Sequence, residues 1–160
     1  MILPIYLIFA ATLILSLFKI KFTVIRDFLL IVLASILIYL AATRPSDVAN
    51  DYLIYVDYWH TKFLKDVESS FIHIRNLLKN DFDLGYSSLF VVYAVLGVSA
   101  KVYGIRLFTK YVFLSLLVYI SHYYILHELT QIRVGVASGF FIIALYFLTT
   151  RDYVKFYIFI

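Results

Sequence analysis

The sequence has no cysteine and few charged residues. Without cysteine, disulfide bonds, thiolate metal sites and a cysteine nucleophile are all excluded. Only 15% of the 160 residues are charged, whereas 64% are apolar. A soluble domain of this length needs more polar residues to cover its surface. The composition therefore excludes a soluble globular protein and predicts a chain embedded in a lipid bilayer.

The positive charge of the chain is not concentrated in one place. The formal net charge is +4, but the basic residues lie at the ends of apolar blocks and form no stripe or patch. A nucleic-acid-binding domain would gather them on one face. We therefore expect no nucleic-acid partner, and we read the basic residues as topology signals.

The first apolar run has no basic segment before it. Lys19 and Lys21 follow the run instead of preceding it. A cleaved signal peptide carries its basic residues on the N-terminal side. The run is therefore predicted to be a retained membrane helix.

Apolar runs recur along the whole chain. A helix needs roughly 20 apolar residues to cross about 30 Å of hydrocarbon, and several runs approach this length. The predicted spans are residues 2–18, 28–42, 84–100, 111–126 and 134–149, with another beginning at 156. We therefore predict an all-α protein, a polytopic transmembrane helix bundle forming a single integral membrane domain. Because the last run stops with the chain, we expect the sequence to be the N-terminal part of a longer protein.

One long polar segment, residues 43–83, interrupts the apolar runs. Within it, apolar residues recur at three- and four-residue spacing over 51–67, and more weakly over 69–78, as in amphipathic helices. These stretches are too charged to cross a bilayer. We predict that they lie flat in the interface, with Trp59 and the neighbouring tyrosines at headgroup level.

The basic residues also predict an orientation. Three short turns, at 19–27, 101–110 and 151–155, are rich in lysine and arginine, whereas the other side of the bundle holds most of the acidic residues. By the positive-inside rule these turns face the cytoplasm. The N-terminus and the outer loop 43–83 are then expected outside.

Two arginines lie at boundaries between polar and apolar sequence. Arg44 follows the second run, and Arg133 follows Gln131 in a short polar break between two runs. A guanidinium stays charged and donates a fork of hydrogen bonds to phosphate oxygens, so both arginines are candidates for binding an anionic lipid-borne substrate. The alternative is that both are interfacial anchors. Likewise Tyr52, Tyr55 and Trp59 form either an aromatic belt or a platform for sugar rings.

The segment from His127 to Gln131 approaches the HExxH metalloprotease motif but lacks its second histidine. His122 and His127 are five residues apart and do not share a helix face. We therefore expect no metal site. No P-loop, dinucleotide-binding glycine pattern or GxSxG elbow occurs, and no cofactor is expected.

Four short motifs in order resemble the EpsG family, which belongs to the Wzy-like polymerases of exopolysaccharide, capsule and O-antigen. They are Arg44-Pro45, Asp51-Tyr52-x-x-Tyr55, Asp83-Leu84-Gly85-Tyr86 and Gln131-Ile132-Arg133.

The resemblance implies a membrane glycosyltransferase of the bacterial cytoplasmic membrane. The implied enzyme would join undecaprenyl-diphosphate-linked repeat units on the outer face of that membrane. Other membrane proteins of polysaccharide assembly are further expected partners. In that transfer a sugar hydroxyl attacks an anomeric carbon while a lipid diphosphate leaves, so the site needs cations for the leaving group, and a carboxylate can serve as the base. The implied roles are diphosphate binding by Arg44 and Arg133 with Gln131 beside them, base catalysis by Asp51 or Asp83, and sugar binding by Tyr52, Tyr55 and Trp59.

Two other classes remain open from the sequence. A non-catalytic membrane subunit or a transporter component would use the outer loop as a partner surface, and a transporter would place polar residues along a path through the spans. A glycan ligase or membrane acyltransferase would share the same outer architecture.

Overall fold

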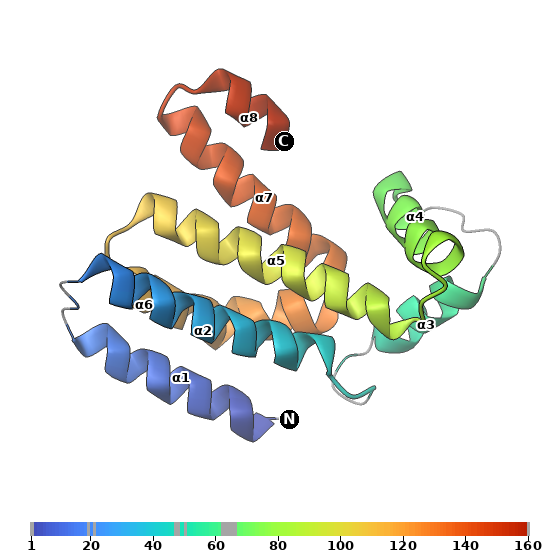
Figure 1. The fold of residues 1–160 in the computed structure, drawn as a ribbon, viewed down its shortest axis with the longest axis horizontal. Helices are drawn as coiled ribbons and strands as arrows, with labels where there is room; N and C mark the ends of the chain where they lie inside the picture. Colours follow the sequence, from blue (N-terminus) through green and yellow to red (C-terminus); the bar gives the residue numbers. More distant parts are fainter. Residues whose placement is uncertain are drawn as a thin grey trace.

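The computed structural model describes residues 2–18, 20, 22–46, 49, 51–61 and 67–159. Every regular element in this part of the chain is a helix (Figure 1). The elements are α1 (Ile2–Leu17), α2 (Thr23–Ala42), α3 (Tyr52–His60), α4 (Ser69–Asn76), η1 (Leu77–Asp81), α5 (Ser87–Phe108), α6 (Val112–Val118), η2 (Tyr119–Thr130), α7 (Ile132–Thr149) and α8 (Tyr153–Phe159). The elements η1 and η2 are π-helical continuations of α4 and α6. The predicted all-α fold is confirmed.

Four helices are long and apolar enough to cross a membrane. They are α2, α5, the continuous helix Val112–Thr130 formed by α6 and η2, and α7. The N-terminal helix α1 is also apolar but has only 16 residues, which rise about 24 Å at 1.5 Å per residue. The protein is a membrane protein with a helical bundle.

The structure corrects the predicted boundary at Lys101. The sequence placed this residue in a basic turn after the span 84–100, but α5 continues to Phe108 and buries Lys101 in its interior. The prediction failed because a charge was taken to end the helix, whereas Lys101 forms an ion pair with Glu128 inside the bundle. Helix α2 also starts earlier than expected, at Thr23 instead of residue 28.

Helix α5 occupies the centre of the bundle, with α2 on one side and α7 on the other (Figure 1). Small residues allow α5 and α7 to approach closely: a Cβ added at Gly139 would lie 2.8 Å from Ala100 Cβ, and one at Gly104 would lie 2.6 Å from Ile142 Cγ2. This agrees with the role of small residues at helix interfaces in membranes. Helix α1 packs against α6, and α8 folds back on α7.

The helices α3, α4 and η1 form a cap at one end of the bundle, beside the start of α5 (Figure 1). Tyr55 and Trp59 on α3 are each 4% exposed and pack in one cluster with Phe71 of α4 and Phe90 of α5. The aromatic face of α3 packs against protein, and its predicted position at the level of the lipid headgroups stays a prediction. Residues 62–66, the end of the predicted helix 51–67, lie outside the described residues.

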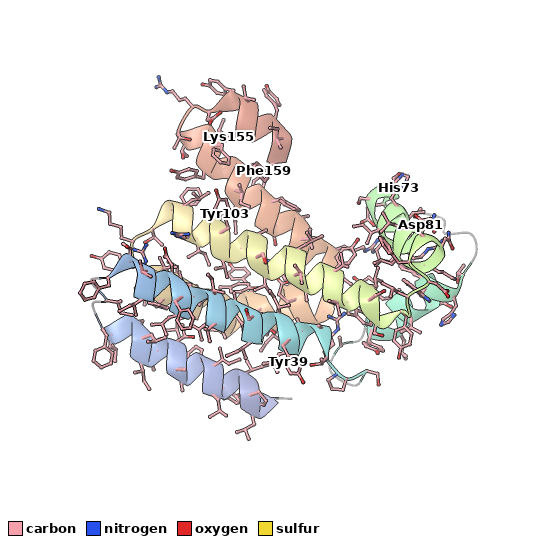
Figure 2. All side chains as sticks on the ribbon, viewed as in Figure 1. Tyr39, His73, Asp81, Tyr103, Lys155 and Phe159 are labelled. Atoms are coloured by element: carbon pink, nitrogen blue, oxygen red, sulfur yellow. The ribbon has the colours of Figure 1, made fainter. Side chains whose placement is uncertain are left out.

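The opposite end of the bundle carries the turns after α1, α5 and α7 (Figure 1). Figure 2 shows Lys155 on α8, away from the cap that bears His73 and Asp81. The protein therefore has two polar ends separated by apolar helices.

Candidate functional site

Arg44 is buried where α2 ends. Its side chain is one of the few buried charges, with 4% exposure. One nitrogen, Nη1, donates hydrogen bonds to the carbonyl of Glu128 at 2.9 Å and to that of Ala41 at 3.3 Å. The guanidinium carbon lies 4.2 Å from the centroid of the Phe90 ring, a cation–π contact. Helix α2 and η2 thus hold the guanidinium against the start of α5.

Two further guanidinium nitrogens of Arg44 have no hydrogen-bond partner in the described part of the chain. Among the residues that the structure describes, neither Nε nor Nη2 makes a hydrogen bond. Burial lowers the pKa of Arg44 to about 10, with only partial opposition from Tyr55, Tyr52 and Tyr124. The group still carries its charge at neutral pH. It is a desolvated cation with two free donors, an arrangement that an anion would stabilise.

Arg75 provides a contrast within the same molecule. It is also buried, at 7% exposure, but its nitrogens donate to the carbonyls of Tyr58 and Thr61, each at 2.9 Å, and to the side chain of Asn76. This arginine ties α4 to the end of α3. Burial alone therefore does not leave an arginine without partners in this protein.

Arg133 lies in the first turn of α7 and faces the cap. It forms an ion pair with Glu68, and its side chain is 28% exposed. Its guanidinium carbon lies 5.6 Å from the ring centroid of Phe71 and 5.9 Å from those of Tyr55 and Tyr58. These contacts hold a second cation over the aromatic cluster.

Tyr55 lies between the two cations, because it packs against Phe90 beneath Arg44 and also lies under Arg133. Burial raises the pKa of Tyr55, although the nearby Arg133 and, more weakly, Arg44 oppose the shift. Tyr52 stacks on Phe90, with ring centroids 4.8 Å apart. The predicted residues Arg44, Arg133, Tyr52 and Tyr55 therefore come together around one end of α5.

The remaining predicted residues take different positions. Asp51 directly precedes α3, is partly buried, and its charge reaches Tyr55. Asp83 is exposed in the turn before α5, with a left-handed φ of 49°. Gln131 is exposed at the junction of η2 and α7. Trp59 is buried inside the cap, where its carbonyl accepts a hydrogen bond from Lys79 at 2.7 Å. Trp59 therefore supports the aromatic cluster from within.

Sequence reasoning missed the buried polar group directly behind Arg44. The carboxylate of Glu128, 1% exposed, forms an ion pair with Lys101 and accepts a hydrogen bond from the Tyr119 hydroxyl at 3.1 Å. Lys101 also donates to the Gly135 carbonyl at 2.6 Å. A Cβ added at Gly97 would collide with the carboxylate. The glycines of α5 and α7 make room for this pair.

A signal for the pair was present in the sequence. Apolar residues resume after Lys101 at Val102 and Tyr103 and again at Ile105, before the next charge at Arg106, so the lysine does not end the apolar stretch. A charge inside a membrane helix needs a partner of opposite sign. Glu128, at the end of the next long apolar stretch, was the acidic residue available.

Metal binding finds no support in the described residues, among which no cluster of three or more His, Cys, Asp or Glu side chains could hold an ion. His127 lies with its Nδ1 3.4 Å from the Ser138 hydroxyl. The chemistry available at this end is therefore that of guanidinium, carboxylate and phenol groups.

Comparison with known proteins places the chain in a family. The profile of the EpsG family matches residues 27–160, which include every residue of the candidate site. The chain belongs to the EpsG family. No curated protein and no solved structure matches. Membership of the EpsG family, with the membrane-spanning helices, indicates a role in polysaccharide biosynthesis, and the resemblance noted in the sequence is confirmed.

Proposed function

We propose that this EpsG-family protein polymerises lipid-linked oligosaccharide repeat units. In this proposal it transfers a growing glycan from an undecaprenyl diphosphate carrier to a sugar hydroxyl of a second lipid-linked unit. The family supports the general role in polysaccharide biosynthesis. The observation that carries the specific reaction is the buried guanidinium of Arg44 with two unused donors.

The leaving group of this reaction accounts for Arg44. A lipid diphosphate gains negative charge as the glycosidic C–O bond breaks, and it enters from the membrane. Nε and Nη2 of Arg44 can donate to two of its oxygens, while Nη1 stays fixed to the Glu128 carbonyl. A donor set held rigidly in a dry site stabilises such developing charge most effectively. Arg133, fixed over the aromatic cluster, supplies the second positive charge.

The bonds, the proton and the electron pair of the proposed transfer can all be accounted for. An acceptor hydroxyl attacks the anomeric carbon and forms the new C–O bond, and its proton passes to a carboxylate. The electron pair of the broken C–O bond leaves with the lipid diphosphate. No redox step or bound metal enters this scheme.

Asp51 is the better of the two candidate bases. It precedes the helix that carries Tyr52 and Tyr55, and its charge reaches Tyr55 between the two arginines. Asp83 is the second candidate, on the exposed turn that leads into α5.

Tyr52 and Tyr55 are assigned to the sugar rings, Gln131 to the rim of the site, and Trp59 to support of the cap. The cap faces the outside of the bacterial cytoplasmic membrane, as the basic turns favour.

The test is glycan chain length, normalised to the amount of folded protein, in cells that produce single variants. Arg44→Lys and Arg133→Lys keep the charge but lose the forked donors, so both should shorten the polymer. A lost contact of this kind costs roughly 3–4 kcal/mol, or about 10²–10³ in rate. Asp51→Asn should abolish polymerisation, whereas Asp83→Asn should retain it. Arg106→Lys, at the other end of the bundle, is the matched control and should behave as wild type.

Other outcomes would select the alternatives. If polymer length follows only the amount of protein in the membrane for all these variants, the arginines are anchors and the protein is a non-catalytic subunit. If the variants stop transfer to an acceptor that is not lipid-linked while polymer length stays normal, the protein is a ligase.

A further inference from the structure

The buried ion pair between Lys101 and Glu128 adjoins the anion site. Glu128 contributes to two different contacts: its backbone carbonyl accepts a hydrogen bond from Arg44 Nη1 at 2.9 Å, and its carboxylate pairs with Lys101. Both side chains of the pair are 3% exposed or less. Glu128 therefore holds Arg44 in place without using its carboxylate to do so.

The carboxylate of Glu128 is nevertheless the obvious competitor for Arg44. It belongs to the residue whose carbonyl already binds Arg44, and its Oε2 atom makes no hydrogen bond to any described residue. A buried guanidinium and a buried carboxylate attract strongly where little water screens them. If the two groups paired, Arg44 would have no free donors for a substrate.

Three other arginines form ion pairs with carboxylates. Arg26 and Arg106 pair with Asp27, and Arg133 pairs with Glu68. Arg44 has no carboxylate partner among the described residues. The carboxylate of Glu128 pairs with Lys101 instead, and Lys101 and the Tyr119 hydroxyl both donate to its Oε1 atom.

We propose that Lys101 is a positioning residue for the anion site: by neutralising Glu128 it keeps the guanidinium of Arg44 free to bind a diphosphate. The pair has no net charge whether the shared proton lies on the lysine or on the glutamate, so the site retains the full positive charge of Arg44. This inference rests on the proposed function, since it assumes that Arg44 receives a diphosphate.

A merely structural role for the pair is the alternative. Buried ion pairs seldom add stability relative to apolar residues of similar volume, whereas removal of one partner leaves an uncompensated buried charge. If the pair served only stability, Lys101→Met would destabilise the fold, whereas the double variant Lys101→Met/Glu128→Gln would fold nearly as well as wild type. Neither change would alter how tightly the folded molecules bind an anion.

The experiment measures binding of farnesyl diphosphate to the purified protein in phosphatidylcholine nanodiscs, per folded molecule, with farnesol as the uncharged control. Lys101→Met releases Glu128 to pair with Arg44 and should lower the affinity about 10- to 100-fold, the factor that one charged hydrogen bond is worth. Lys101→Met/Glu128→Gln removes the competing carboxylate and should restore the affinity. In an Arg44→Ala background, Lys101→Met should cause no further loss.

Failure of the inference about Lys101 and failure of the proposed function give different results. Equal affinity of wild type and folded Lys101→Met, or failure of the double variant to restore binding, overturns the inference. If Lys101→Met does not fold, Glu128→Gln decides: it should bind at least as tightly as wild type, and a tenfold loss would contradict the proposal. If Arg44→Ala binds farnesyl diphosphate as well as wild type does, the proposed function itself fails, which is a separate result.

Discussion

Arg44 at the cap end differs from the cations at the opposite end of the bundle, although Arg133, also at the cap end, forms a partly exposed ion pair with Glu68. At the end formed by the turns after α1, α5 and α7, cations lie in exposed ion pairs: Arg26 and Arg106 meet Asp27, and Lys155 meets Asp152, with side chains 25% to 54% exposed. At the cap end, Arg44 is 4% exposed and two of its nitrogens have no partner among the described residues.

An exposed ion pair and a buried, unpaired cation differ in their effect on stability. An exposed ion pair contributes about 0–1 kcal/mol, so a cation there can serve as a membrane anchor at little cost. A buried donor without a partner costs about 1–3 kcal/mol. A chain that needed only an anchor would not bury Arg44 in this way. The cap end is therefore where we assign substrate binding.

The first prediction tests on which side of the membrane each end lies. The protein has no cysteine, so single cysteines at His73 and Arg151, both exposed, can be labelled on intact cells with an impermeant reagent. We expect complete labelling of His73→Cys and none of Arg151→Cys. The reverse pattern would place the cap in the cytoplasm and remove the outward-facing site.

The second prediction concerns the packing of the cap. Trp59→Glu removes a buried indole from the aromatic cluster and places a charge there, so the cap should lose about 3–5 kcal/mol of stability. His60→Glu, on the exposed neighbouring residue, should change it by less than about 0.5 kcal/mol. Limited proteolysis of the cap in vesicles measures both. Equal resistance of the two variants would mean that α3 does not pack on α5 as described.

The smallest change in stability is expected at the end of the bundle formed by the turns after α1, α5 and α7. Asp27→Asn removes the carboxylate shared by Arg26 and Arg106, and because these pairs are partly exposed, stability should fall by no more than about 1 kcal/mol. Thermal unfolding in detergent is the measurement. A loss of several kcal/mol would show that the exposed ion pairs are structural, and the contrast between the two ends would disappear.

The helices and most of the site were predictable because their signals are local. Apolar runs mark membrane helices, and the polar segment 43–83 marked the cap. Arg44, Arg133, Tyr52 and Tyr55 stood out as polar and aromatic groups at membrane boundaries, and the structure brings these four together.

The remaining features depended on contacts between distant residues. The sequence shows that Lys101 needs a partner but not that the partner is Glu128, since 27 positions separate the two residues. The burial of Trp59 likewise required the position of Phe71 and Phe90. The packing of the aromatic face of α3 against protein could not be read from its periodicity, which is the same for a face that meets lipid.

The central claim is that the Arg44 end carries out glycosyl transfer and the opposite end only anchors the bundle. The most direct test uses purified protein in vesicles with a synthetic undecaprenyl-diphosphate-linked repeat unit, and measures both polymer length and released undecaprenyl diphosphate. Wild type and Arg106→Ala should release carrier as the polymer grows, whereas Arg44→Ala should be slower by about 10²–10³. Release of carrier at equal rates by Arg44→Ala and Arg106→Ala, or no release by wild type, would contradict the account.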